Sequence, residues 1–442
     1  MDTLTRRFAA AVLLVLALAR AAAAQSPSPL QASAAPAPAP ASAPQGPAAP
    51  QGPAAPQAAA AAKPADPPAL KVTPYGIAYF NLFSNSDAVN NGDVPLFAAA
   101  SGPGHLGMTA RQSRLGIRVT GAKVGKANVS AVVEGDFFGG YPAVGIGDNM
   151  GVFRLRLANA RLDWTKGSLV VGQDWMIFAP VNPVSISSAG IPLFAAAGNP
   201  WSRLPQIRGE WKTKKVLLQG GLLAPQTGDF NSAFFYQPGS GALAETPFLQ
   251  GRAALTLANF ASSKKVATIG VSGHWGQSRV TTTAADRTFD SNGVAADWVL
   301  PLGTKITVQG EAFTGSNLGG FQAGIFQGLI ADGALTGADG VVRLDGPRGI
   351  DTSGGWVQVV AAVTPTVTVH GAFGTDDPDD ADFLTVTRRE TRIENTAISF
   401  GFQHKASAQV TWGVEYRRLE TKYLIAGDKD VHHLNVGFTF TF

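Results

Sequence analysis

The sequence predicts an all-β protein, a transmembrane antiparallel β-barrel of about sixteen strands. Three observations lead to this prediction. Apolar and polar side chains alternate along many short segments, the connections between segments are short and long in turn, and aromatic residues gather at both ends of the segments. Short turns are expected on the periplasmic side of the barrel and long loops on the extracellular side.

The first residues predict export from the cytoplasm. Arg6 and Arg7 precede an apolar run at 8–18 and alanines at 22–24, which is the pattern of a signal peptide covering residues 1–24. The run is too short to span a bilayer as a helix. Three arginines and one aspartate leave with this segment, so the formal charge falls from +4 to +2. That balance gives no reason to expect a nucleic-acid partner.

Residues 25–70 predict a disordered periplasmic linker. They are dominated by alanine, proline, serine and glutamine, and the hexapeptide QGPAAP occurs twice in tandem at 45–56. Proline at this density prevents helix and sheet formation and favours a semi-rigid extended chain. An inert spacer and a tether that touches the cell wall or a periplasmic partner both remain open. The barrel is expected over 71–442.

The barrel strands follow from period-two alternation. In chain order, the expected strands are 73–84, 110–121, 127–139, 152–164, 168–178, 204–213, 215–224, 248–259, 265–275, 293–300, 305–315, 354–363, 366–374, 395–405, 407–418 and 432–442. Long loops are expected at 85–108 and 179–201. The alternation slips at 158–160 and 170–176, where a bulge is expected.

Aromatic residues mark both ends of these strands. At the short-turn end they are Trp164, Trp211, Trp298 and Phe442; at the other end they are Phe83, Phe137, Trp275, Phe373 and Tyr416. Two such girdles are typical of a barrel held at both membrane interfaces, with outer-membrane lipid and lipopolysaccharide as surroundings.

The segment 432–442 predicts how the barrel closes. Phe438, Phe440 and Phe442 fall on one face of an extended strand, and the threonines between them fall on the other. We expect the phenylalanines to face lipid and the strand to pair with 75–83, because lipid cannot satisfy an open sheet edge. A terminal aromatic after an alternating strand also resembles the feature by which the outer-membrane assembly machinery recognises its clients, so Phe442 is expected to bind that machinery.

Taking the apolar face as outward assigns the lumen face. The expected pore-lining residues place arginines beside carboxylates on neighbouring strands: Arg114, Arg118, Glu134, Asp136, Arg154, Arg156, Arg208, Glu210 and Arg252. Further residues expected inside are Gln112, Gln206, Gln250, His274, Asp297, Gln309, Glu311, His370, Gln403, Glu415 and Arg417. Rings of arginine stabilise anions in pores, which predicts a preference for small anionic solutes. The alternative is that the arginines only brace the wall through ion pairs.

Two loop segments share the hexapeptide PLFAAA, at 95–100 and 192–197. An apolar hexapeptide is unfavourable in free solution, so each copy is expected to pack into the barrel mouth, against the other loop or at a subunit contact. We favour inward folding for the second copy, and a chance similarity between alanine-rich segments stays open.

Other chemical functions find little support in the sequence. The acidic loop 375–382 lacks the central glycine and terminal glutamate of a calcium loop, and the absence of cysteine excludes thiolate sites. The adjacent His432 and His433 must point to opposite faces. We therefore expect no metal and no cofactor. No Ser, His and acid grouping predicts an enzyme, although an outer-membrane lipase or protease remains an alternative.

Four segments resemble the DcaP-like outer-membrane porins over 71–442: TARQSRLGIRVTG at 109–121, FRLRLANARLDW at 153–164, VGQDWMIF at 171–178 and VGFTFTF at 436–442. The resemblance implies a homotrimer of sixteen-stranded barrels that takes up small anions such as dicarboxylates through an arginine-lined pore, with Arg114, Arg118, Arg154 and Arg156 on matching strands. The proline-rich linker replaces a helical segment common in these porins, which leaves trimerisation to barrel contacts. The alternative function is a non-conducting structural or adhesive barrel tethered by its linker.

Overall fold

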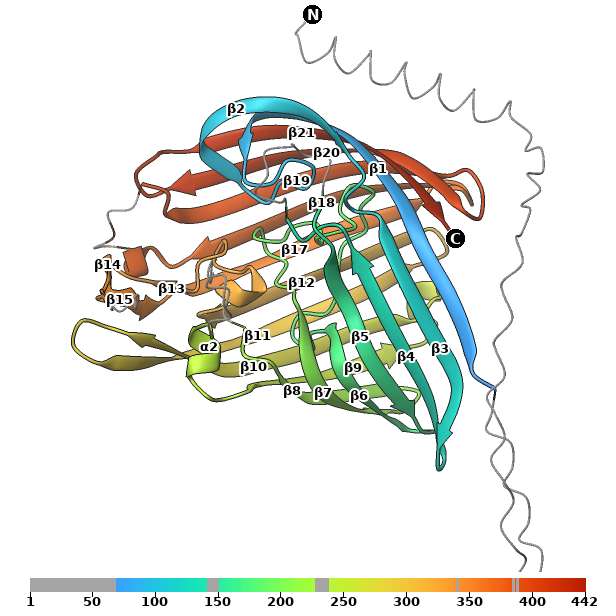
Figure 1. Ribbon diagram of the computed structural model, residues 1–442. Helices are drawn as coiled ribbons and strands as arrows, with labels where there is room; N and C mark the ends of the chain where they lie inside the picture. The colour runs from blue at the N-terminus through green and yellow to red at the C-terminus, as the bar shows by residue number, and fades with distance from the viewer. Residues whose placement is uncertain (1–68, 141–150, 227–237, 339–341, 384–385, 387–388) are drawn as a thin grey trace, which may run out of the picture. The chain divides into compact units, whose positions relative to one another are not determined.

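The computed structural model describes residues 69–140, 151–226, 238–338, 342–383, 386 and 389–442. The predicted signal peptide and all but the last two residues of the predicted linker lie outside these residues. Within them, seventeen strands form one antiparallel sheet, and all but β2 make a closed ring (Figure 1). The structure thus confirms the predicted sixteen-stranded barrel.

The first half of the ring consists of β1 (Lys71–Val89), β3 (Arg114–Val124), β4 (Ala127–Asp136), β5 (Arg154–Asp163), β6 (Gly167–Trp175), β7 (Arg203–Lys212), β8 (Val216–Leu223) and β9 (Phe248–Leu257). The second half consists of β10 (Ala267–Thr281), β11 (Asp286–Leu302), β12 (Ile306–Ser316), β17 (Asp351–Ala362), β18 (Val367–Pro378), β19 (Arg392–Lys405), β20 (Val410–Tyr423) and β21 (Lys429–Thr441). Strands of this length suffice to cross a bilayer when tilted.

The barrel closes between its first and last strands. β21 pairs with β1 from Thr441 opposite Ile77 to His433 opposite Asn85. The other side of β1 pairs with β3, from Lys71 opposite Thr120 onward. No strand of the ring is left as an open edge, and the predicted closure is confirmed.

The outer face of the barrel is apolar because alternate side chains of each strand point away from the ring. Leu115 and Ile117 of β3 are 51% and 49% exposed. On β21, Phe438, Phe440 and Phe442 are exposed as well, on the face opposite the buried Asn435. The alternation that predicted the strands therefore corresponds to the two faces of the wall.

One strand was not expected. The segment 85–108, predicted as a loop, continues β1 to Val89 and returns as β2 (Ala98–Thr109), which pairs with β1 above the start of β3. β2 contains the sequence AAASGPGHLGMT, which shows no alternation. β2 is held by backbone pairing with β1. Because its side chains do not alternate between apolar and polar, the sequence did not indicate a strand there.

Of the two expected bulges, the first is present two residues from its predicted place, and the second is absent from the pairings of β6. The register between β4 and β5 shifts between the pairs Glu134–Leu157 and Gly135–Leu155, so Arg156 is the additional residue. In the second segment, Gly172 has a left-handed φ of +121°, and β5, β6 and β7 keep their register around it.

Smaller elements lie in the long loops and turns. They are the helix α2 (Ser240–Leu243), the 3₁₀ turns η2 (Phe260–Ser262), η3 (Gly319–Phe321) and η4 (Asp380–Phe383), and two short hairpins. The hairpins are β13 (Leu329–Ile330) with β16 (Arg348–Gly349), and β14 (Gly333–Thr336) with β15 (Val342–Asp345). Across the described residues, no helix has the length and apolar character needed to cross a membrane.

Candidate functional site: the lumen and its inner loop

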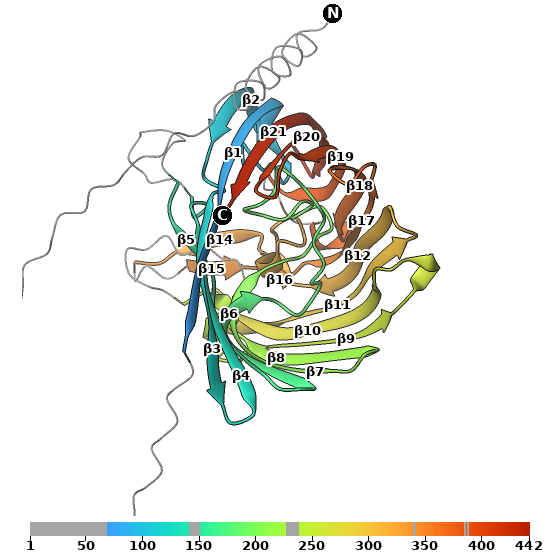
Figure 2. The ribbon, with the colours of Figure 1, turned by 90° about the vertical axis from the view of Figure 1, so that its right-hand side faces the viewer.

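The lumen is occupied by residues 176–202, which connect β6 to β7 and which we name the inner loop. Figure 2 looks into the ring and shows green backbone segments running inside it. The inner loop begins beside β9 and β10, passes β12 and β17, and reaches β20 and β3, as its hydrogen bonds establish. It therefore follows the wall around much of the barrel interior.

Side chains of the wall accept the backbone N–H groups of the inner loop. A buried N–H must find a partner, and a loop inside a barrel has no sheet to supply one. The pairs are Ile177 and Phe178 with Gln250, Ala179 with Ser272, Val181 with Glu311, Val184 with Gln358, Ile186 with Glu415, and Ala189 and Gly190 with Gln112. Several residues assigned to the lumen face from sequence are thus the attachment points of this loop.

Apolar packing fixes the first part of the inner loop. Ile177 and Phe178 are almost fully buried in a cluster with Phe248 of β9, Phe313 of β12 and Phe321 of η3. Phe178 and Phe321 have ring centroids 6.2 Å apart, and Phe248 and Phe321 5.9 Å. This burial opposes any movement of the loop toward the barrel axis.

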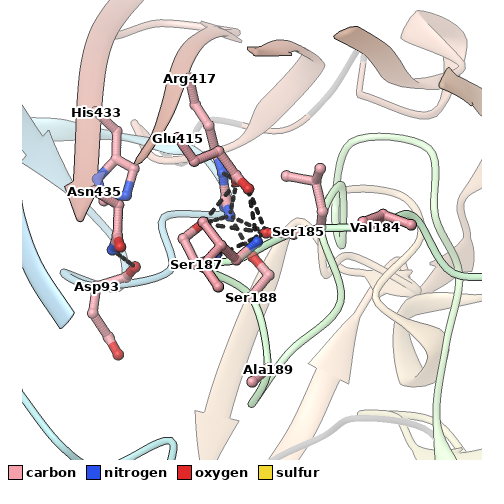
Figure 3. Close-up of polar contacts among 12 residues, drawn as sticks. Asp93, Val184, Ser185, Ser187, Ser188, Ala189, Glu415, Arg417, His433 and Asn435 are labelled. Carbon is pink, nitrogen blue, oxygen red and sulfur yellow. Dashed lines mark hydrogen bonds and ion pairs between the residues drawn. The ribbon is translucent and has the colours of Figure 1, made fainter. Parts of the chain in front are cut away.

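The middle of the inner loop is held by a polar group that we name the serine latch: Ser185, Ser187 and Ser188 with Glu415 and Arg417 of β20. Figure 3 shows the latch, with its hydrogen bonds and ion pairs dashed. The hydroxyls of Ser185 and Ser187 each donate to the Glu415 carboxylate at 2.7 Å. Arg417 pairs with Glu415 at 2.8 Å and also donates to Ser187 and Ser188. Every member is buried or half-buried, so the latch lies out of bulk water.

The two PLFAAA segments meet on the same wall residue. The side-chain amide of Asn395 in β19 donates to the carbonyl of Leu96 at 2.9 Å and to that of Ala196 at 2.6 Å. Thr421 of β20 donates to Asn395 at 2.8 Å and accepts the N–H of Ala98 at 2.9 Å. Both copies are folded inward against the wall, and Asn395 joins the two loops.

The sequence-predicted arginines of β3 and β5 surround two carboxylates of β4. Arg156 bridges Glu134 and Asp136 at 2.8 Å each, and Arg154 holds Asp136 through two hydrogen bonds of 2.8 and 3.0 Å. Arg114 lies 3.6 Å from Glu134. Arg114 and Arg154 also donate to the carbonyls of Ala189 and Gly190 in the inner loop.

Exposure within this group is unequal. The side chains of Arg114 and Arg154 are 20% and 25% exposed, whereas those of Glu134 and Asp136 are 7% and 0% exposed. The carboxylates therefore lie behind the guanidinium groups, and the accessible surface of the group is cationic.

A further arginine joins this group without a carboxylate partner. Arg203, the first residue of β7, places its guanidinium carbon 4.0 Å from the ring centroid of Trp175 and 5.0 Å from that of Trp201. Among the described residues its Nε has no hydrogen-bond partner and no carboxylate pairs with it. It lies within electrostatic range of Arg154 and Arg156. We name Arg114, Arg154, Arg156 and Arg203 the arginine wall.

The other predicted pore-lining residues are placed on the wall beyond this group. Arg208 lies 3.0 Å from Asp174 and 2.9 Å from Glu210, and Glu210 also accepts from Arg161 at 2.5 Å. Arg252 of β9 makes two hydrogen bonds to Asp297 of β11 at 2.9 and 2.5 Å. Each of these arginines is therefore paired with at least one carboxylate.

Arg118 is placed apart from the other predicted residues. It lies on β3 toward the short turns, is exposed, and has the ring of Tyr75 5.8 Å away. The structure brings together Arg114, Glu134, Asp136, Arg154 and Arg156, and leaves Arg118 outside that group. Arg203 and its tryptophans were not among the predicted residues. Arg203 and Trp201 precede the segment where alternation was expected for β7, and Trp175 lies in the segment where the alternation of β6 slips.

Comparison with known proteins shows which solved structures share this fold. No protein-family model matches the sequence, and no curated protein sequence is similar to it. Among solved structures, the chain is similar to the outer membrane channel DcaP of Acinetobacter baumannii, with a TM-score of 0.63 and 17% identity over 84% of this chain and 97% of that one. For an anion-selective porin from Comamonas acidovorans, the TM-score is 0.52 and the identity 15%, over 85% of this chain and 100% of that one. For the trimer form of OmpT from Vibrio cholerae, the TM-score is 0.50 and the identity 10%, again over 85% of this chain and 100% of that one.

The chain has the fold of the outer-membrane porins. The resemblance to the DcaP-like porins that four sequence segments indicated is confirmed for the fold, because the match to the DcaP channel extends over almost all of the barrel.

Proposed function

We propose that this chain is an outer-membrane porin, a passive diffusion channel that favours small anionic solutes and carries out no chemical step. The arginine wall is the observation that carries the proposal. Three of its guanidinium groups pair with two carboxylates, Glu134 and Asp136, and the fourth, that of Arg203, pairs with none among the described residues, which leaves the group with a net positive charge. Cations arranged in this way stabilise an anion in transit.

Bracing explains only some of the arginines. Arg156 is 3% exposed and bridges two carboxylates, so its contacts stabilise the wall of the barrel. Arg203 has no acid to brace and is stacked on tryptophans, so a structural role does not account for its charge. The contacts thus support a bracing role for Arg156 and a role in anion preference for Arg203. Small dicarboxylates fit a surface on which several guanidinium groups lie close together.

The inner loop supports a passage of restricted width. It is held against the wall at several strands, so it would narrow the lumen without closing it. Buried polar groups with no partner among the described residues, including Asn81 and Ser399, are consistent with water inside the ring. A non-conducting structural or adhesive barrel is the alternative, in which the inner loop and its neighbours would fill the lumen.

We propose in addition a homotrimer, with Phe442 as the contact for the assembly machinery. Support for the trimer comes from the fold shared with an outer membrane protein solved in trimer form. Phe442 is exposed on the outer face directly after β21, where a second protein can reach it.

A hydrolase is the less favoured function. The latch does bring Ser187, Glu415 and a histidine near one another, since His370 Nε2 lies 3.7 Å from Glu415. However, neither ring nitrogen of His370 has a hydrogen-bond partner among the described residues, so His370 does not contact a serine hydroxyl of the latch.

Single-channel recording of the refolded protein in a planar bilayer tests the proposed function. We expect discrete conductance steps that occur in groups of three, because each barrel of a trimer would conduct. A mass of three chains by native mass spectrometry should accompany them. A correctly folded protein that never conducts would contradict the porin proposal and favour the structural barrel.

A further inference from the structure

The short-turn end of the barrel carries a concentration of lysines that the proposed channel does not explain. All but one of its described turns have a lysine in or beside them. The turn from β7 to β8 contains Lys214 and Lys215, that from β9 to β10 contains Lys264 and Lys265, and Lys166 lies in the turn from β5 to β6. We name these five the rim lysines. All are exposed.

The same end of the barrel has little negative charge. Among the described residues of these turns and the strand ends beside them, Asp163 is the carboxylate present, and it is bound by Arg161 and Ser168. None of the rim lysines forms an ion pair within the described part of the chain. Their charge is therefore available to a partner.

Exposed apolar side chains accompany the rim lysines on the outer wall. Trp164 is 42% exposed and lies two residues before Lys166, and Val266 is 49% exposed and follows Lys265. Trp211, 46% exposed, ends the outer face of β7 just before the turn of Lys214. Tryptophan in this position marks the membrane interface, and lysine next to it reaches the phosphate level.

We propose that the rim lysines bind anionic phospholipid headgroups in the periplasmic leaflet of the membrane. Charge alone would also suit an acidic cell-wall polymer. The exposed tryptophan and valine beside the lysines favour lipid, because they place the positive charges at the edge of the hydrocarbon layer. Positive charge near an anionic leaflet is attracted to it, and salt weakens the attraction. The inference rests on the membrane location proposed above and is independent of the solute.

Lipid selectivity can be measured by electron spin resonance on the full chain refolded into phosphatidylcholine vesicles. Trace phosphatidylglycerol or phosphatidylcholine, spin-labelled on the acyl chain, reports the lipid held at the barrel surface. We expect the protein to prefer phosphatidylglycerol by at least about twofold at low salt and to lose the preference in high salt.

Two variants connect the preference to the rim lysines. Replacement of all five by serine (Lys166→Ser, Lys214→Ser, Lys215→Ser, Lys264→Ser, Lys265→Ser) should bring the ratio close to one, and replacement of the same five by arginine should preserve it. Heat-modifiable migration on a gel shows that each variant is folded and inserted. Failure of the wild-type protein to insert would instead count against the proposed membrane location.

Two results would overturn the inference. The first is an inserted wild-type protein without headgroup preference, and the second is a preference that survives the serine variant. If the serine variant kept the lipid ratio but lost binding to purified cell-wall sacculi, the lysines would be assigned to the cell wall.

Discussion

Replacing Arg114 and Arg154 with glutamine is expected to reduce the anion preference of the channel severalfold. Both guanidinium groups are partly exposed, and both carboxylates behind them keep Arg156 as a partner, so the wall should stay folded. A unit charge about 7 Å from a solute contributes about 0.6 kcal/mol in water, which is roughly threefold in occupancy. Loss of two charges should therefore lower the occupancy of an anion by up to about sevenfold and raise that of a cation in proportion, so the ratio of anion to cation permeability should fall at least severalfold.

The control for this variant removes the same charge elsewhere. Arg279 and Arg287 lie on the β10–β11 hairpin at the long-loop end, and their replacement by glutamine should change the permeability ratio much less. Permeability ratios come from zero-current potentials in a salt gradient. Equal changes in the two variants would show that overall charge, and not the arginine wall, determines selectivity.

Replacing Glu415 with alanine is expected to release the inner loop. The carboxylate is fully buried and accepts hydrogen bonds from Ser185, Ser187 and the N–H of Ile186. Its loss also leaves Arg417 buried without its carboxylate, which typically costs about 3–5 kcal/mol. We expect a lower unfolding temperature, a larger and noisier single-channel conductance, and faster uptake of larger sugars in a liposome-swelling assay.

A double variant separates the latch from the buried charge. Glu415→Met with Arg417→Met removes both charges, so much of the stability should return. The serines and Ile186 would still lack their acceptor, so the larger conductance should remain. If conductance returned to the wild-type value together with stability, the latch would not be what holds the inner loop.

The barrel was predictable because its strands obey a local rule. Phe438, Phe440 and Phe442 alternate with threonine, so the face that each residue occupies can be predicted from the local sequence alone, without its neighbours in space. The same rule placed Gln250, Glu311 and Glu415 inside. It failed for β2, whose pairing with β1 depends on backbone hydrogen bonds and not on side-chain pattern.

The partners of those inward residues could not be predicted. The bond between Ser185 and Glu415 joins residues 230 positions apart, and such a contact depends on the path of the inner loop across the barrel. Arg203 was missed for a related reason. It stands at a loop-to-strand junction, and its environment comes from Trp175, which is its partner across the β6–β7 pairing, and from Trp201 at the end of the inner loop.

The zero-current potential of the wild-type protein in a gradient of potassium chloride tests the central claim most directly. The arginine wall predicts a zero-current potential with the same sign as the equilibrium potential of chloride, because chloride would pass a cationic lumen more easily than potassium. A potential of the opposite sign, or one near zero, would contradict an anion-favouring channel.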